Sequence, residues 1–259
     1  RTRRRAGTPA IRVAAAVKGA PISIVGAGSF GTALANHLAA LGQRVTMAVR
    51  RDEQAQEIRE THKTERYLPD LSLNESIAAT TDLSTAVQQA SLVLLVLPSR
   101  SFREVAHNIG DSLRGDQIIV HATKGIEVGT YQRMSEILRQ ETCALKIGVI
   151  SGPNLAREII GGHPAGALVA SRFAEVTTAV QQLFRGSSLR IYASDDVVGT
   201  EIGGSFKNII ALAAGMVDGM RLGDNTKSLL VTRGLSEMAR FGVLMGADVF
   251  TFGGLAGIG

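Results

Sequence analysis

The stretch Pro21-Ile22-Ser23-Ile24-Val25-Gly26-Ala27-Gly28-Ser29-Phe30-Gly31 decides the fold of this chain. It begins with an apolar run of strand character and ends in the pattern Gly-x-Gly-x-x-Gly, and a helical pattern follows over residues 32–41. A strand, a glycine-rich turn and a helix in this order predict a dinucleotide-binding unit. The alternative is a glycine-rich turn that binds no ligand.

Each glycine of the pattern has its own physical task. Gly26 permits the tight turn, Gly28 lets a pyrophosphate approach the backbone, and Gly31 permits close packing of the helix on the strand. The helix N-terminus adds free N–H groups and the positive end of its dipole. We therefore predict that these three glycines bind the cofactor.

Outside this stretch, strand-like and helical segments alternate along the chain. Helical patterns occur between most of the strands, for example at residues 102–109, 131–139 and 173–184. The strand patterns occupy residues 44–49, 77–80, 92–97, 117–122, 146–150, 166–170 and 189–192. Such alternation of nearly continuous apolar strands with helices predicts an α/β fold of the Rossmann type, with a doubly wound, mostly parallel sheet covered on both faces.

The strand patterns stop near residue 195, where two apolar, helix-length segments begin at residues 198–220 and 228–245. We predict a dinucleotide-binding domain over residues 21–194 and an all-helical substrate domain over residues 195–259, which we expect to be incomplete. Residues 1–20 hold six basic and no acidic side chains, and we expect a disordered basic tail there. An organellar targeting segment is the alternative. We expect the natural chain to extend past both printed ends.

The composition excludes several classes of protein. The chain has 28 basic and 23 acidic residues, and removal of the six basic residues of the tail leaves 22 against 23. A body so close to neutral is not that of a nucleic-acid-binding protein. The apolar runs are too short to span a bilayer, and we expect a soluble, cytoplasmic protein.

The cysteine and histidine content bears on metals and on the redox compartment. The single cysteine, Cys143, excludes an internal disulfide and a cysteine-based metal cluster, and the five histidines show no metal-ligand spacing. We therefore expect no bound metal and a reducing compartment. We expect Cys143 itself to be a small buried residue rather than a nucleophile.

The end of the second predicted strand discriminates between cofactors. An NAD site usually has an acidic residue there to hold the ribose hydroxyls, whereas this chain has Arg50 and Arg51. Two guanidinium groups fit a 2′-phosphate by charge and by bidentate geometry. The pair therefore predicts that NADP is preferred over NAD, and a solvated basic turn is the alternative.

Two lysines occupy unusual positions. Lys124 follows the predicted strand at residues 117–122, at the carboxyl edge of the sheet where ligands bind, and Lys207 lies in an otherwise apolar helix. A lysine in such a helix either extends to the surface or is desolvated, so that its pKa falls and it can act as a base. The residues alone leave both possibilities open.

Several segments taken together resemble the bacterial-type NAD(P)-dependent glycerol-3-phosphate dehydrogenases, from about residue 21 to the end. Beside the glycine pattern, they are Ala122-Thr123-Lys124-Gly125-Ile126-Glu127, Ser151-Gly152-Pro153-Asn154-Leu155-Ala156, Gly204-Ser205-Phe206-Lys207-Asn208-Ile209 and Gly223-Asp224-Asn225-Thr226-Lys227. The resemblance implies an enzyme that interconverts sn-glycerol 3-phosphate and dihydroxyacetone phosphate by hydride transfer at C2, with NADP or NAD as cofactor. It further implies a role in glycerophospholipid synthesis and a homodimer in the full-length protein.

The resemblance also implies roles for single residues. The implied cofactor contacts are Ser29, Phe30, Arg50, Lys124 and Ala156, and the implied substrate contacts are Lys124, Gly152 and Asn154. Lys207 matches the proton acceptor, and Asn208 beside it is expected to hydrogen-bond the substrate. Burial and the charge of Lys124 would both lower the pKa of Lys207. The family has an aspartate and an Arg-Asn pair after the segment matching residues 254–259, and the printed sequence ends before them.

Two other functions remain open. Another two-domain dehydrogenase, acting on a different hydroxy acid, is not expected to carry residues 223–227 together with Lys124 and Lys207. A non-catalytic dinucleotide-binding module is the second, but it would not explain why Lys207 lies inside an apolar helix.

Overall fold

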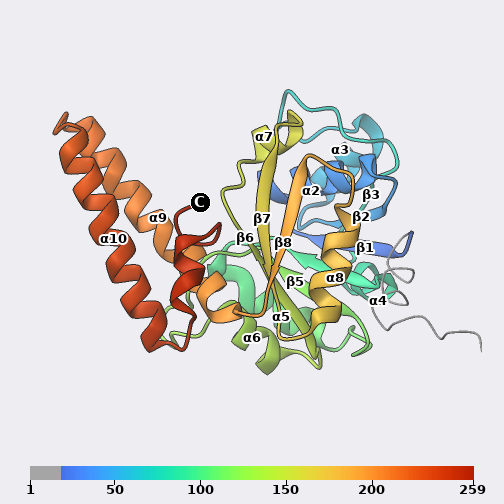
Figure 1. The fold of residues 1–259 in the computed structure, drawn as a ribbon. Helices are drawn as coiled ribbons and strands as arrows, with labels where there is room; N and C mark the ends of the chain where they lie inside the picture. Colours follow the sequence, from blue (N-terminus) through green and yellow to red (C-terminus); the bar gives the residue numbers. More distant parts are fainter. Residues whose placement is uncertain (1–18) are drawn as a thin grey trace, which may run out of the picture.

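The computed structural model describes residues 19–259, so the predicted tail at residues 1–20 lies almost wholly outside them. Eight strands form one sheet in the order β3-β2-β1-β4-β5-β6-β7-β8 (Figure 1). They are β1 (Pro21–Val25), β2 (Arg44–Ala48), β3 (Ala78–Thr80), β4 (Leu92–Leu95), β5 (Ile118–His121), β6 (Lys146–Ser151), β7 (Ala165–Ala170) and β8 (Leu189–Ser194). Every predicted strand is confirmed.

The sheet is parallel except at one junction. Strands β6 and β7 pair antiparallel, with Ile150 opposite Val169, and all the other pairs are parallel. The strand order reverses beside β1, because β2 and β3 lie on one side of it and β4 to β8 lie on the other. In open α/β sheets, ligands bind at the carboxyl ends of the strands at such a reversal. The glycine pattern follows β1 directly and therefore lies at this point.

Helices cover both faces of the sheet, and each face has its own core. In β1, Ile22 and Ile24 belong to the core under α2, α3 and α8, whereas Val25 belongs to the core under α4, α5 and α6. This follows from the strand period of two, which sends successive side chains to opposite faces. The helices are α2 (Ser29–Ala40), α3 (Asp52–Thr61), α4 (Leu83–Gln89), α5 (Phe102–Gly110), α6 (Met134–Glu141), α7 (Ala156–Ile160) and α8 (Ala174–Leu183), with a 3-10 turn η1 (Ser99–Ser101) before α5.

Four local predictions need correction. Helix α10 (Asp224–Leu244) begins four residues before the predicted start, because Gly223 is its N-cap residue. Helix α2 begins at Ser29, three residues before the predicted start, because Gly28 is its extended N-cap residue. Helix α6 begins at Met134, three residues after the predicted start, because Tyr131 has a positive φ of 58° and Arg133 is extended. Cys143 is exposed rather than buried.

Beyond the sheet, α9 (Val197–Gly219) and α10 (Asp224–Leu244) pack side by side, and the 3-10 helix η2 (Val249–Gly253) folds back on both (Figure 1). Ile202, Met238 and Phe252 form the core of this part. We propose that it is a separate domain starting near residue 195, because β8 ends at Ser194 and α9 begins at Val197. None of the helices in residues 19–259 has both the length and the apolar character needed to cross a membrane.

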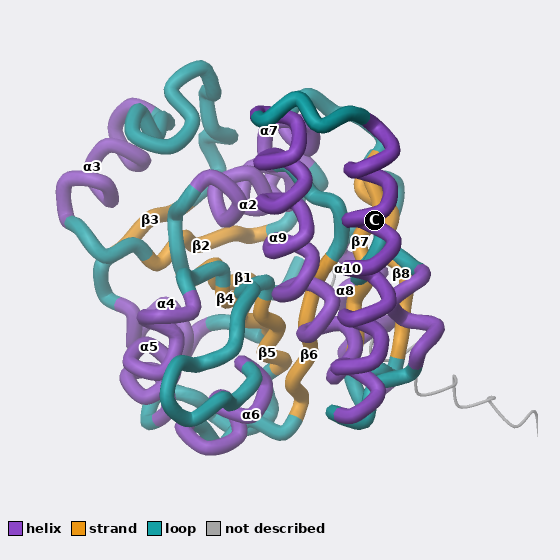
Figure 2. The backbone as a smooth tube through the Cα atoms, turned by 90° about the vertical axis from the view of Figure 1, so that its left-hand side faces the viewer, coloured by secondary structure: helices purple, strands orange, loops and turns teal. Residues whose placement is uncertain are grey.

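Helix α9 also packs against the end of β6, and Figure 2 shows it beside that strand. The approach is close because Gly204 has no side chain: a β-carbon there would lie 2.6 Å from Ser151 Oγ. The N-terminal half of α9 is buried, including Glu201, Ile202 and Gly203. The fold therefore brings the helix that carries Lys207 to the carboxyl edge of the sheet.

Candidate active site

The glycine loop between β1 and α2 has two packed glycines and one open glycine. Gly26 has a φ of 108°, and a β-carbon on it would overlap the carbonyl oxygen of Val96. A β-carbon on Gly31 would overlap the carbonyl oxygen of Gly26, whereas Gly28 has nothing within 4 Å of that position. Gly28 therefore leaves space beside the N-terminus of α2, where the first backbone N–H groups have no partner within the helix.

A cavity of about 350 Å³ opens beside this loop, and we refer to it as the glycine-loop cavity. Six of the residues that line it were predicted to contact the cofactor or the substrate: Gly28, Phe30, Gly31, Lys124, Gly152 and Asn154. The other lining residues are Val96, Leu97, Pro98, Ala122, Thr123, Ile150 and Ser151. They come from the ends of β1, β4, β5 and β6, which are neighbours in the sheet. The carboxyl ends of these strands thus enclose a site next to an open helix N-terminus.

A second cavity, of about 420 Å³, lies between the loop after β6 and the helices α9 and α10. We refer to it as the lysine cavity, because Lys124 and Lys207 both line it. Its remaining lining residues are Gly152, Pro153, Asn154, Leu155, Glu158, Asn208, Ile210, Ala211, Ala214, Val231, Leu235, Gly257, Ile258 and Gly259. Lys124, Gly152 and Asn154 line both cavities, so the two cavities adjoin.

Both lysines have a lowered pKa, and burial is the largest cause for each. Burial and, in second place, the charge of Lys124 lower the pKa of Lys207 to about 8. Burial also lowers the pKa of Lys124. Lys207 Nζ donates to the carbonyl oxygens of Leu255, at 3.4 Å, and Gly259, at 3.2 Å. The amine therefore stays within the cavity and is partly desolvated, as a lysine that acts as a base needs to be.

Two buried polar atoms in these cavities lack a hydrogen-bond partner. They are Ser151 Oγ, at the end of β6, and Asn154 Oδ1. Buried polar atoms are nearly always paired in folded proteins, so unpaired ones at a cavity wall are ready to bind a ligand. Asn154 was predicted as a substrate contact, whereas Ser151 was not. A signal for Ser151 existed in the sequence, because it is a polar residue at the carboxyl end of an apolar strand.

Five of the predicted cofactor residues line neither cavity. Gly26 forms the turn after β1, where its α-carbon packs against the backbone of Val96. Ser29 donates through its hydroxyl group to the carbonyl oxygen of Tyr67, at 3.3 Å. Ala156 is the first residue of α7. Arg50 and Arg51 lie between β2 and α3, where Arg51 is the N-cap residue of α3. Because Ala48 pairs with Val25, the two arginines lie on the same edge of the sheet as the glycine loop. Their contact with a cofactor remains a prediction.

Metal ligation has no candidate among residues 19–259, because no three ligating side chains of His, Cys, Asp or Glu lie close together there. The polar side chains that line the two cavities are those of Ser151, Thr123, Asn154, Asn208, Glu158, Lys124 and Lys207. Desolvated lysines suit proton transfer and the binding of an anionic substrate.

Two models of one protein family match this chain. The family model for the NAD-dependent glycerol-3-phosphate dehydrogenase N-terminus matches residues 21–177, and the model for the C-terminus of the same family matches residues 196–259. The glycerol-3-phosphate dehydrogenase (NAD(P)+) of Acinetobacter baylyi is 44% identical over 92% of this chain and 66% of its own length. That of Ectopseudomonas mendocina is 46% identical over 92% of this chain and 70% of its own length. The chain thus spans about two thirds of these relatives.

Solved structures show the same fold. The crystal structure of glycerol-3-phosphate dehydrogenase from Coxiella burnetii is 36% identical, with a TM-score of 0.88 over 93% of this chain and 74% of that chain. A glycerol-3-phosphate dehydrogenase structure from Dunaliella salina is 26% identical, also with a TM-score of 0.88, over 96% of this chain and 46% of that chain. The likeness extends through the sheet and the helices that follow it.

Proposed function

This chain belongs to the NAD-dependent glycerol-3-phosphate dehydrogenase family, and we propose that its two adjoining cavities form the active site of an NADP-preferring enzyme that interconverts sn-glycerol 3-phosphate and dihydroxyacetone phosphate. One observation carries the proposal: Lys124, Gly152 and Asn154 line both cavities. A cofactor in the glycine-loop cavity and a substrate in the lysine cavity would therefore meet at these residues. Such contact is what direct hydride transfer needs.

The glycine-loop cavity fits a dinucleotide. Gly28 leaves the backbone open at the N-terminus of α2, and this supports binding of the pyrophosphate there. The unpaired hydroxyl group of Ser151 offers a further hydrogen bond. Arg50 and Arg51, on the same edge of the sheet, would hold a 2′-phosphate, which supports NADP over NAD. When bound, the nicotinamide supplies the hydride acceptor or donor.

In the lysine cavity, one lysine transfers the proton of the substrate and the other offsets the negative charge of its phosphate. Neutral Lys207 Nζ accepts the proton of the C2 hydroxyl group during oxidation and returns it during reduction. Its lowered pKa, about 8, supports this role, because an ordinary lysine with a pKa of 10.5 is almost fully protonated near neutrality. Lys124, when protonated, offsets the negative charge of the phosphate, and Asn154 and Asn208 hydrogen-bond the substrate hydroxyl groups.

The product would supply glycerophospholipid synthesis, and a homodimer is part of the same proposal. Light scattering after size-exclusion chromatography tests the dimer. The activity is tested by the oxidation of NADPH on addition of dihydroxyacetone phosphate, with Lys207→Ala as the matched control. Activity that depends on both dihydroxyacetone phosphate and Lys207 supports the proposal.

Two other results would contradict it, and each identifies a rival function. Faster oxidation of NADPH with an unphosphorylated 2-oxo acid would identify a dehydrogenase for another hydroxy acid. Binding of NADPH, measured as a rise in Tm, without turnover of any carbonyl compound would identify a dinucleotide-binding module.

A further inference from the structure

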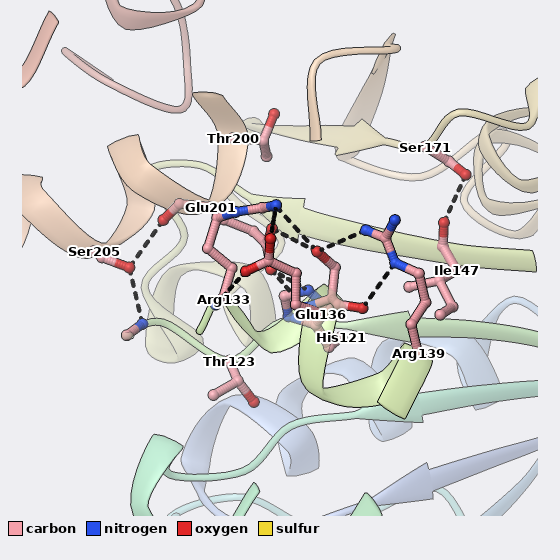
Figure 3. A network of polar contacts seen from close by, with 12 residues as sticks. His121, Thr123, Arg133, Glu136, Arg139, Ile147, Ser171, Thr200, Glu201 and Ser205 are labelled. Carbon is pink, nitrogen blue, oxygen red and sulfur yellow. Dashed lines mark hydrogen bonds and ion pairs between the residues drawn. The ribbon is translucent and has the colours of Figure 1, made fainter. Parts of the chain in front are cut away.

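A buried carboxylate on helix α9 joins that helix to the start of α6 and to the end of β5. The side chain of Glu201, only 3% exposed, accepts hydrogen bonds from Arg133 Nη1 at 2.6 Å, from the Ser135 backbone N–H at 2.7 Å and from Ser135 Oγ at 2.7 Å (Figure 3). His121 Nε2 lies 3.2 Å from the same carboxylate, close enough for an ion pair but not aligned for a hydrogen bond. We refer to Glu201, Arg133, Ser135 and His121 as the Glu201 cluster.

The Glu201 cluster keeps its carboxylate ionised despite its burial. Burial alone would raise the pKa of Glu201, but the His121 imidazole and the Arg133 guanidinium outweigh it and hold the pKa below the ordinary value. Such a buried ion pair contributes little net stability compared with apolar residues of the same size. What it does supply is one defined arrangement, because its hydrogen bonds are directional and any displacement leaves a buried charge unpaired.

The position of the Glu201 cluster relates it to both lysines. His121 is the last residue of β5 and stands three residues before Lys124. Glu201 lies on α9 and stands six residues before Lys207. Six residues are less than two helical turns, so the rigid helix transmits a shift at Glu201 directly to Lys207.

A second hydrogen-bond link runs parallel to the first. Ser205 Oγ accepts from the backbone N–H of Gly125 at 2.9 Å and donates to the carbonyl oxygen of Glu201 at 2.8 Å (Figure 3). Gly125 directly follows Lys124, and Ser205 stands two residues before Lys207. This link joins the segment of Lys124 to α9 directly, whereas the hydrogen bonds of the Glu201 carboxylate join α9 to the start of α6 and its contact with His121 joins α9 to β5.

We propose that Glu201 is a positioning residue of the reaction, whose buried carboxylate fixes α9 on the start of α6 and against His121 at the end of β5, and thereby fixes Lys207 beside Lys124. The inference rests on the proposed function only in taking Lys207 as the proton acceptor. The placement of the two amines can be measured without cofactor or substrate.

The surroundings of Lys207 make this placement measurable. The charged side chains that line its cavity are Lys124 and the exposed Glu158, and α10 contributes only the apolar Val231 and Leu235. In the 259-residue chain, the carboxylate of Gly259, 3.2 Å from Lys207 Nζ, is a further charge that the parent and the variants share. Repulsion by Lys124 therefore depends on the separation of the two amines, which the Glu201 cluster sets. If α9 shifts away, Lys207 becomes less buried and lies farther from the charge of Lys124, so its pKa rises.

The experiment measures acetylation of Lys207 by acetic anhydride as a function of pH, quantified by mass spectrometry of the peptides of the full 259-residue chain. Only the neutral amine reacts, so the midpoint reports the pKa of Lys207. The variants are Glu201→Gln, which keeps the shape but removes the charge, and Ser205→Ala, which removes only the second link. The matched control is Glu136→Gln, because Glu136 pairs with Arg133 at 2.6 Å without a bond to α9.

We expect a midpoint near 8 in the parent chain and in Glu136→Gln, and a rise toward 10.5 in Glu201→Gln. Ser205→Ala should show a smaller rise. An unchanged midpoint in a Glu201→Gln chain with the circular dichroism of the parent would overturn the proposal. If that variant does not fold, Ser135→Ala, which removes one hydrogen bond to the Glu201 carboxylate, takes its place, and an unchanged midpoint in that variant overturns the proposal.

Turnover separates this inference from the proposed function. In the active enzyme, Glu201→Gln should lower kcat and move its pH profile upward, with the KM for NADPH unchanged. Loss of turnover in Lys207→Ala together with an unmoved midpoint in Glu201→Gln would reject the role of Glu201 and leave the proposed function intact. Retained turnover in Lys207→Ala would reject the proposed function. It would also mean that the position of Lys207 relative to Lys124 serves no catalytic step.

Discussion

The half-buried amine of Lys207 lies in the same cavity as that of Lys124, and the charge of Lys124 is the second of two causes that lower the pKa of Lys207 to about 8. The larger cause is burial. Removal of the charge at position 124 should therefore raise the pKa of Lys207 only part of the way to 10.5. Lys124→Met tests this, because methionine keeps the length and the apolar character of the lysine stem.

The measurement for Lys124→Met is again the pH midpoint of Lys207 acetylation, which does not depend on turnover. Lys63, which is exposed and pairs with Glu65 at 3.6 Å, serves as the internal reference. A midpoint that stays at the parent value would mean that burial alone sets the pKa of Lys207.

The pKa of Lys207 also sets the pH dependence of the reaction. Oxidation of glycerol 3-phosphate needs neutral Lys207, so kcat for oxidation should rise as the pH increases through about 8. Reduction of dihydroxyacetone phosphate needs the protonated amine, so its kcat should fall over the same range. The two profiles should cross in opposite directions, and parallel profiles would exclude Lys207 as the proton carrier. Initial rates in both directions, in buffers of constant ionic strength, give the answer.

Replacement of Lys207 should separate catalysis from cofactor binding. Lys207→Ala is expected to lower turnover by about 10²–10⁴-fold, the usual effect of removing a general base. NADPH binding should be nearly unchanged, because Lys207 lines the lysine cavity and not the glycine-loop cavity. Steady-state rates and calorimetric NADPH titration of the same preparation measure both. Equal losses in turnover and affinity would show that Lys207 acts through the cofactor site instead.

The strands and the glycine loop could be predicted from the sequence because their signals are local. Each strand is a short apolar run, and the glycines are required by contacts within a few residues or with the neighbouring strand. The start of α6 could not be predicted, because Tyr131 adopts a positive φ of 58° that a tyrosine rarely has. The pattern gave no sign of that turn.

The candidate site was predicted in part for a similar reason. Lys124 and Lys207 were noticed because each is a charged residue next to apolar runs, and the fold brings them into one cavity. Glu201 and His121 are likewise polar residues next to apolar runs, but their role becomes clear only once their partners are known. The cluster they form comes from three separate segments, namely β5, the start of α6 and α9. The order of the sheet decides which segments meet, and only the structure supplies it.

The two arginines after β2 should decide between the cofactors. The double change Arg50→Ala with Arg51→Ala is expected to weaken NADPH binding by about 1.5–3 kcal/mol, the range for hydrogen bonds to charged groups. NADH binding should change little, because NADH lacks the 2′-phosphate. Arg44→Ala is the matched control, since Arg44 is exposed at the opposite end of the same strand. Calorimetric titration of both cofactors is the measurement, and equal losses for NADH and NADPH would contradict the prediction.

The open and the packed glycine of the loop should respond oppositely to alanine. Gly28 has φ −75° and ψ 177°, which alanine adopts readily, and nothing lies within 4 Å of the added carbon. Gly28→Ala should therefore change the free energy of unfolding by less than about 1 kcal/mol, because the lower entropy of the unfolded state is offset by the poorer N-cap that alanine makes. The methyl group would occupy the space beside the α2 N-terminus and weaken NADPH binding by about 1.5–3 kcal/mol. Gly31→Ala should instead cost about 1–3 kcal/mol of stability or more, because its methyl group overlaps the backbone of Gly26. Urea unfolding and NADPH titration of both variants test the pair. A stable Gly28→Ala chain with the parent's NADPH affinity would show that the pyrophosphate does not bind at this loop.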